Sequence, residues 1–228
     1  MIHAVIYLVP LGAGRFELYS EPPDDEPSSS ARPEGFFRSR IHRLREWWRD
    51  AVHSARQRDQ SAPAGRLARA RDWVVSSIVE MVAEQRTLWS LRDASSATLV
   101  YPSDFAAHQE IAERDRILVH ARRHHGVWLV IDAALFAGSG VFVFIPGPNV
   151  LAYYFAVRVV GHYLCWRGAG QALTRTIWQT RSEPALAELG SLVNMPREAR
   201  APRVAEIAID LNLPRLAAFF DRAAVPAR

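Results

Sequence analysis

The sequence contains no lysine, and all 28 of its basic residues are arginine. It also has only one cysteine, Cys165, which excludes an intrachain disulfide framework and a multi-cysteine zinc module. Apolar residues make up 49% and charged residues 23% of the 228 residues, a composition that excludes a wholly disordered chain. The chain is therefore long enough and apolar enough to bury a core.

Changes in composition divide the chain into segments. β-branched and aromatic residues flank a glycine-rich break and predict a β-hairpin over residues 1–20. Residues 21–35 are rich in proline, serine and acid, which is typical of a linker. Apolar stripes at helical spacing predict a soluble helical region over residues 36–125. Short segments separated by prolines predict a small helical region over residues 181–228.

The apolar residues are concentrated between residues 126 and 180. Residues 127–145 carry one charged residue, Asp132, and residues 150–166 form a second apolar segment. A run of this length is near the minimum for crossing the roughly 30 Å hydrocarbon core of a bilayer. The breaker that separates the two segments consists of Pro146, Gly147, Pro148 and Asn149. We therefore predict a mainly α protein with an N-terminal β-hairpin, a helical bundle and a hydrophobic, transmembrane helical hairpin. The alternative is a hairpin buried inside a soluble helical protein.

The distribution of charged residues around this hairpin is consistent with its insertion into a membrane. Arginines lie before and after it, whereas the turn carries no charge. The positive-inside rule then places both ends on the cytoplasmic or matrix side. The aromatic residues Trp128, Tyr163 and Trp166 lie near the predicted interface.

Three ionisable residues lie within the hairpin. Asp132 and His162 are at a similar distance from the turn, and Arg158 is one helical turn before His162. Ionisable residues inside a membrane pair with one another or mark a proton or ion path. Three interpretations remain open: an Asp132–Arg158 ion pair that locks the hairpin, residues at the membrane interface, or a site that exchanges protons.

No other pattern predicts a specific chemistry. His120 and His124 have a spacing that metal ligands use on helices, and His125 follows them, but no further ligand accompanies them. We expect surface or interfacial histidines and no metal. The arginine-rich segment 36–58 is expected to pack its apolar stripe on a neighbouring helix, and we predict no nucleic-acid binding. The sequence contains no nucleophile elbow, P-loop or HExxH motif, so we predict neither an enzyme nor a cofactor.

The turn and the second apolar segment carry an ordered set of residue types. They comprise a Pro-x-Pro-Asn turn, adjacent aromatic residues, an arginine, a histidine, and a small-residue run before a final leucine. These are Pro146–Asn149, Tyr153–Phe155, Arg158, His162, Gly168–Gly170 and Leu173. Because it carries these residue types in this order, the chain resembles the mitochondrial K⁺–H⁺ exchange-related family. Leu91–Arg92 and Leu99–Pro102 extend the resemblance upstream.

The resemblance implies a membrane protein implicated in potassium/proton exchange and cation homeostasis. It further implies contacts with a lipid membrane, potassium ions and protons. If the chain transports ions, we expect Asp132 and His162 to exchange protons and Arg158 to regulate them electrostatically. Two spans are few for an ion path, so a homo-oligomer or a protein partner would be required. The alternatives are a non-transporting membrane-anchored adaptor or regulator and a soluble helical interaction protein.

The lysine-free composition suggests a GC-rich bacterial source. No basic segment precedes the first apolar run, and we expect neither a signal peptide nor a mitochondrial transit peptide. We therefore expect the protein in a bacterial inner membrane, or in a mitochondrial membrane if the source is eukaryotic.

Overall fold

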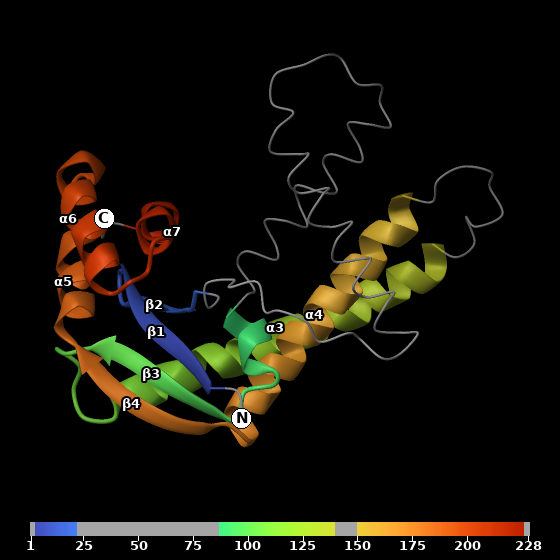
Figure 1. Cartoon of the computed structure of the whole chain (residues 1–228). Coiled ribbons are helices and arrows are strands. Elements are labelled where there is room, and N and C mark those ends of the chain that lie inside the picture. The colour runs from blue at the N-terminus through green and yellow to red at the C-terminus, as the bar shows by residue number, and fades with distance from the viewer. Residues whose placement is uncertain (1–2, 22–86, 140–149, 226–228) are drawn as a thin grey trace, which may run out of the picture. The chain divides into compact units, whose positions relative to one another are not determined.

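A computed structural model of the chain describes residues 3–21, 87–139 and 150–225 (Figure 1). The predicted turn Pro146–Asn149 and nearly all of the predicted linker lie outside these residues, as does much of the predicted helical region. The chain divides into two compact units. Unit 1 contains residues 1–21, 85–129 and 162–228, and unit 2 contains residues 22–84 and 130–161.

Unit 1 is built on one four-stranded β-sheet. Its strands are β1 (His3–Gly12), β2 (Arg15–Tyr19), β3 (Ser96–Pro102) and β4 (Ile177–Glu183), in the order β2-β1-β3-β4. Strands β1 and β2 pair antiparallel as the predicted hairpin, whereas β1 pairs with β3, and β3 with β4, in parallel. The sheet thus joins three segments that are far apart in the sequence.

The tight turn of the hairpin explains its glycines. Gly12 and Gly14 have φ angles of +88° and +69°, and Ala13 between them has a φ of +50°. Positive φ is the region that glycine enters at little cost. A Cβ on Gly12 would also lie 2.3 Å from the carbonyl oxygen of Val225, which the turn approaches closely.

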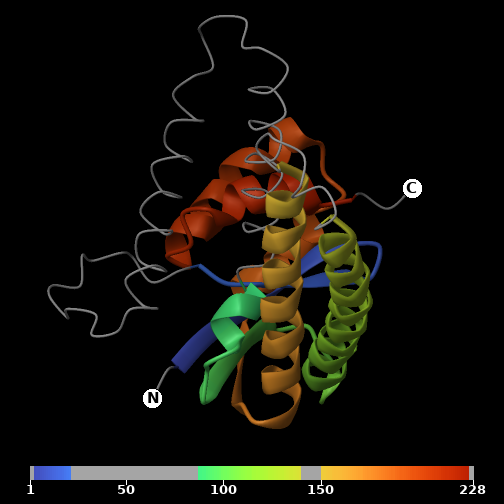
Figure 2. The same cartoon turned by 90° about the vertical axis from the view of Figure 1, so that its right-hand side faces the viewer.

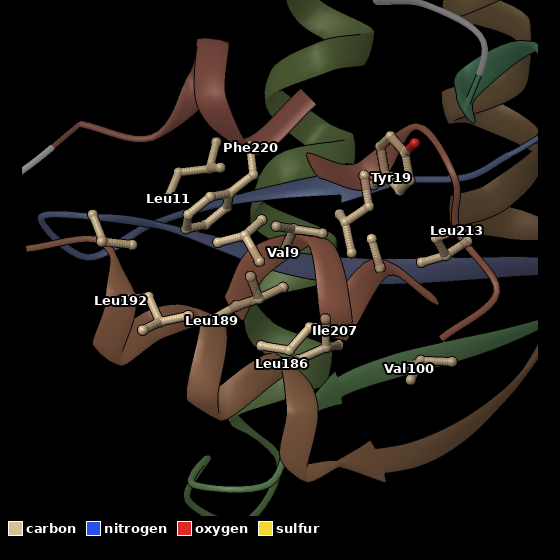
Figure 3. Packing of buried hydrophobic residues seen from close by; sticks show 14 residues of the cluster. Val9, Leu11, Tyr19, Val100, Leu186, Leu189, Leu192, Ile207, Leu213 and Phe220 are labelled. Carbon is tan, nitrogen blue, oxygen red and sulfur yellow. The ribbon is translucent and has the colours of Figure 1, made fainter. Parts of the chain in front are cut away.

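Helices cover both faces of the sheet. Residues 87–91 are helical and precede β3. The longer helices are α3 (Gln109–Ser139), α4 (Val150–Thr174), α5 (Pro184–Leu192), α6 (Arg197–Asp210) and α7 (Leu216–Ala223). Within unit 1, α5, α6 and α7 pack on one face, as Figures 1 and 3 show. The parts of α3 and α4 that belong to unit 1 pack on the other face with the 87–91 segment.

The alternation of side chains along the central strands separates two hydrophobic cores. Ile6 and Leu8 of β1 point into the core formed with α3 and α4, whereas Val9 and Leu11 point into the core formed with α5–α7 (Figure 3). Successive strand residues face opposite sides of a sheet, and these four are at most 1% exposed. Strand β1 is therefore buried on both faces between Leu8 and Leu11.

The C-terminal helices are also fastened to the hairpin by polar contacts. Glu21 accepts hydrogen bonds from the Tyr19 hydroxyl and from the backbone N–H of Arg215, both at 2.7 Å, and Arg215 immediately precedes α7. Burial and the adjacent Glu21 carboxylate raise the pKa of Tyr19 above its ordinary value. The backbone N–H of Val225 donates to the carbonyl of Leu11 at 2.8 Å.

The prediction of a mainly α fold is wrong, because the chain has a mixed α/β fold. Strand β3 lies within the region predicted to be wholly helical. It is only seven residues long, and its strand conformation depends on pairing with the distant β1. Strand β4 carries mostly exposed polar residues, so it lacks the apolar alternation that identifies a strand in a sequence.

The prediction of a transmembrane hairpin is also wrong. Across residues 3–21, 87–139 and 150–225, no helix combines the length and the apolar character that crossing a membrane requires. Helix α3 begins at Gln109, well before the predicted span, and its first half is rich in charged residues. Helix α4 carries Arg158, His162 and Arg167 among its apolar residues.

A glycine on α4 allows the closest helix contact in this part of unit 1. A Cβ on Gly168 would lie 1.8 Å from the carbonyl oxygen of Leu88, within the 87–91 segment. Figure 2 shows this segment, in green, beside the orange α4. Backbone atoms on both sides cannot move aside as a flexible side chain could, so only glycine fits.

We expect Gly168→Ala to lower the free energy of unfolding by about 2 kcal/mol, because the added methyl group forces α4 away from Leu88. The matched control is Gly138→Ala in α3, where the position of a Cβ is open. That change should raise the free energy of unfolding by roughly 0.5–1 kcal/mol, because alanine favours a helix. Urea denaturation measures both, and equal effects of the two changes would contradict the proposed backbone contact.

Candidate functional site

Helices α3 and α4 carry the ionisable residues singled out in the sequence. These residues form an ion pair and a histidine–histidine contact between the two helices, and each contact lies within one of the compact units. Asp132 and Arg158 meet in unit 2, and His125 and His162 meet in unit 1.

Asp132 and Arg158 form an ion pair. The Nε atom of Arg158 lies 3.0 Å from each of the two carboxylate oxygens of Asp132. The Asp132 side chain is 1% exposed, and the Arg158 side chain is 20% exposed. A carboxylate that has lost its water in this way needs a charged, hydrogen-bonded partner, which Arg158 supplies.

Tyr154 completes the environment of Arg158. It lies one turn earlier on α4, with its hydroxyl 3.4 Å from an Arg158 amino group, and the guanidinium carbon is 5.6 Å from the Tyr154 ring centroid. Burial by itself would lower the pKa of Arg158. The hydrogen bonds and negative charge of Asp132, together with Tyr154, outweigh it and raise that pKa above its ordinary value. Arg158 therefore stays charged at any physiological pH.

The structure thus brings together two of the three predicted site residues. Asp132 and Arg158 have the contact that the ion-pair interpretation requires. An ion pair between neighbouring helices fixes their relative rotation, because both charges become costly once separated. Whether the same residues also take part in proton exchange stays a prediction.

The third predicted residue, His162, lies against another histidine. Its Nδ1 atom is 2.8 Å from Nδ1 of His125, and the two residues are 5% and 9% exposed. At this distance one ring donates an N–H to the lone pair of the other. The His162 ring is also stacked on Trp128, with 6.5 Å between ring centroids, and His124 lies edge-on to His125 at 5.3 Å.

The surroundings of His125 favour its neutral form. Burial is the largest influence, followed by the charges that His162 and His124 can carry, and together they lower the pKa of His125 to about 4. Each influence acts in the same direction because a buried imidazolium loses hydration and is repelled by other cations. His125 is therefore neutral at pH 7.

The expectation of exposed histidines at His120, His124 and His125 is wrong for His125. His120 and His124 are exposed, whereas His125 is buried. His125 lies seven residues after Leu118, which is fully buried, and seven residues before Asp132. Since seven residues make about two helical turns, this spacing could have placed His125 on the inner face of α3. Within the parts of the chain that the structure describes, no three His, Cys, Asp or Glu residues are grouped to hold a metal ion.

Cys165 follows His162 by three residues on α4 and is buried. Its sulfur accepts a hydrogen bond from the indole N–H of Trp89 at 3.0 Å. Burial raises the pKa of the thiol to about 12, although the Trp89 hydrogen bond acts against this. The thiolate, which is the reactive form of cysteine, is therefore scarce at neutral pH.

Both contacts fall within the region that a known family shares. A model of a family described as mitochondrial K⁺–H⁺ exchange-related matches residues 6–176. The chain belongs to this family. The match begins in β1 and ends just before β4, so it includes most of the sheet as well as α3 and α4. It confirms the resemblance seen in the sequence, while the expected bacterial origin stays a prediction.

Two further comparisons returned nothing. Neither a curated protein nor a solved structure matches the chain.

We expect Asp132→Asn to lower the free energy of unfolding by about 3 kcal/mol, because it removes the carboxylate charge that lies 3.0 Å from the largely buried Arg158. The matched control is Asp93→Asn, which removes the same charge from the Arg92–Asp93 pair, whose side chains are 31% and 45% exposed. That change should cost less than about 1 kcal/mol. Urea denaturation at pH 7 measures both, and an Asp132→Asn variant as stable as the control would show that the ion pair does not hold α3 and α4 together.

Proposed function

We propose that this protein takes part in potassium/proton exchange at a membrane and contacts that membrane through exposed apolar residues of α3. The relation to potassium/proton exchange is supported by family membership. The membrane contact is supported by one observation about unit 2, the set of large apolar side chains that α3 leaves exposed. The proposal includes no enzymatic activity and no cofactor.

The exposed residues of unit 2 form an apolar surface, which we define as Val130, Ile131, Leu135 and Phe136 of α3 with Val160 of α4. Val130 is 70% exposed and Leu135 is 47% exposed. Isolated apolar residues are common on protein surfaces, but several on consecutive turns of one helix mark an interaction site. Transfer of such side chains from water to an apolar medium is favourable by about 25 cal/mol for each Å² of apolar area.

The residues of unit 1 on the same two helices have the chemistry of a membrane interface. Trp128, Tyr163 and Trp166 are each about two-fifths exposed, and the Arg122 guanidinium lies 5.7 Å from the Trp166 ring centroid. Tryptophan and tyrosine are enriched where headgroups meet acyl chains, and arginine binds the phosphates of anionic lipids. This combination of aromatic and arginine side chains supports a bilayer surface as the partner.

Within this proposal, Asp132, Arg158 and His162 carry the response to protons. Asp132 is the acidic group, Arg158 sets the electrostatic potential at its carboxylate from 3.0 Å away, and His162 supplies an imidazole, which can accept and donate a proton. Buried ionisable groups with specific charge partners are typical of functional sites. Since these residues come from two helices of one chain, an ion path would need further helices from a second copy or from a partner protein.

We expect Val130→Glu with Leu135→Glu to reduce binding of the full chain to phosphatidylcholine vesicles that contain phosphatidylglycerol by at least tenfold, because two apolar contacts are replaced by charges. The matched control is Ile177→Glu with Ile209→Glu, which adds the same two charges at exposed apolar positions on β4 and α6. Co-sedimentation measures the bound fraction. Equal binding of both double variants would exclude the apolar surface as the membrane contact.

We expect Asp132→Asn to lower potassium-dependent proton flux at least fivefold in membrane vesicles from cells that produce the full chain. The reason is that the variant removes the acidic partner of Arg158. A pH-sensitive dye reports the flux after a potassium gradient is imposed, with rates divided by the amount of folded protein. Asp93→Asn serves as the control and should leave the flux unchanged. A flux that does not differ between vesicles with and without the chain would contradict the proposed exchange function.

A further inference from the structure

The His125–His162 contact has a property that the ion pair lacks. Arginine keeps its charge at all physiological pH values, whereas an imidazole side chain becomes protonated when the pH falls through its pKa, ordinarily about 6.5. The two rings come from different helices, with His125 on α3 and His162 on α4. A change in their protonation therefore acts on the packing of these two helices.

The geometry permits only one proton between the rings. With 2.8 Å between the two Nδ1 atoms, one atom carries a hydrogen and the other must offer a lone pair. Protonation of the accepting nitrogen would place two N–H groups against each other at this distance. The hydrogen bond would then be lost, and the two rings would have to separate.

We propose that the His125–His162 pair is a pH-sensitive latch between α3 and α4, closed while a single proton lies between the two Nδ1 atoms and opened when the second Nδ1 atom is protonated. The latch goes beyond the proposed function and does not depend on it, because it concerns the packing of unit 1 alone. If the protein does take part in proton exchange, the latch would couple the α3–α4 contact to the local pH.

The groups that face the pair also favour opening in acid. On α3, His124 lies edge-on to His125 and its charge is one of the influences that lower the pKa of His125, and the Trp128 ring covers His162. On α4, Cys165 follows His162 by three residues and is neutral, with its sulfur bonded to Trp89 of the 87–91 segment. An added proton on the pair is thus repelled by His124 and is not stabilised by the Cys165–Trp89 contact.

The direction of the pH effect follows from the two states. In the open form His125 has its ordinary pKa of about 6.5, whereas in the closed form that pKa is lowered to about 4. The contribution of the pair to the closed form is therefore complete above pH 6.5 and is lost as the pH falls from 6.5 towards 4. One proton is taken up on opening in this range.

We expect the opening equilibrium of α3 and α4 around His125 and His162 to rise roughly tenfold between pH 7 and pH 5.5. Hydrogen exchange of the backbone amides of the full chain measures this equilibrium after correction for the intrinsic effect of pH on exchange. His125→Asn keeps a polar group near the Nδ1 position but cannot be protonated, so its opening should change less than twofold over this range. His124→Asn, at the exposed neighbouring residue, should keep the tenfold response.

A second measurement needs no variant. Nitrogen-15 spectra of the histidine rings of the wild-type chain should show the His125 ring neutral at pH 5.5, because its pKa is lowered to about 4. A tenfold response that persists in His125→Asn would overturn the latch, and so would a His125 ring that titrates with a pKa near 6.5. Neither result involves vesicles or potassium, so failure of the latch and failure of the proposed function can be told apart.

Discussion

The structure of unit 1 depends on the pairing of β1 with both of its neighbours. Strand β1 pairs with β2 on one side and with β3 on the other, and its side chains supply residues to both hydrophobic cores. Ile6 and Leu8 lie under α3 and α4, whereas Val9 and Leu11 lie under α5–α7. A strand buried on both faces must have every backbone group paired and every side chain packed. The helices of unit 1 therefore take their positions from this strand.

Local patterns in the sequence were sufficient to predict part of this fold. The hairpin of β1 and β2 was predicted because its turn needs glycine at positive φ and its strands carry β-branched residues. The sheet beyond the hairpin was missed, because β3 and β4 become strands only through pairing with distant segments. In β4 the exposed side chains of Gln179 and Arg181 leave no apolar alternation to detect. The membrane prediction failed because the apolar run was considered apart from the charged half of α3.

Helix geometry and sequence pattern predicted only part of the candidate site. Asp132 and Arg158 were singled out because charged residues stand out within apolar segments, and opposite charges on adjacent helices attract. The partner of His162 was not found, because His125 lies in a run of histidines of which the other two are exposed. Adjacent residues such as His124 and His125 point in different directions on a helix, and only a view of the whole helix face separates the buried one from the exposed ones. The His125–His162 contact therefore required the structure.

The contact between Leu11 and Val225 has a consequence for how the chain folds. This hydrogen bond joins β1, near the beginning of the chain, to a residue that follows α7, and Glu21 joins the start of α7 to the end of β2. During synthesis, β1 is made before α5–α7, so the face of the strand that these helices cover stays open until they follow. Contacts so distant in sequence form slowly, and exposed apolar strands associate with one another in the meantime. Association through this open face of β1 therefore competes with folding until α5–α7 have packed on it.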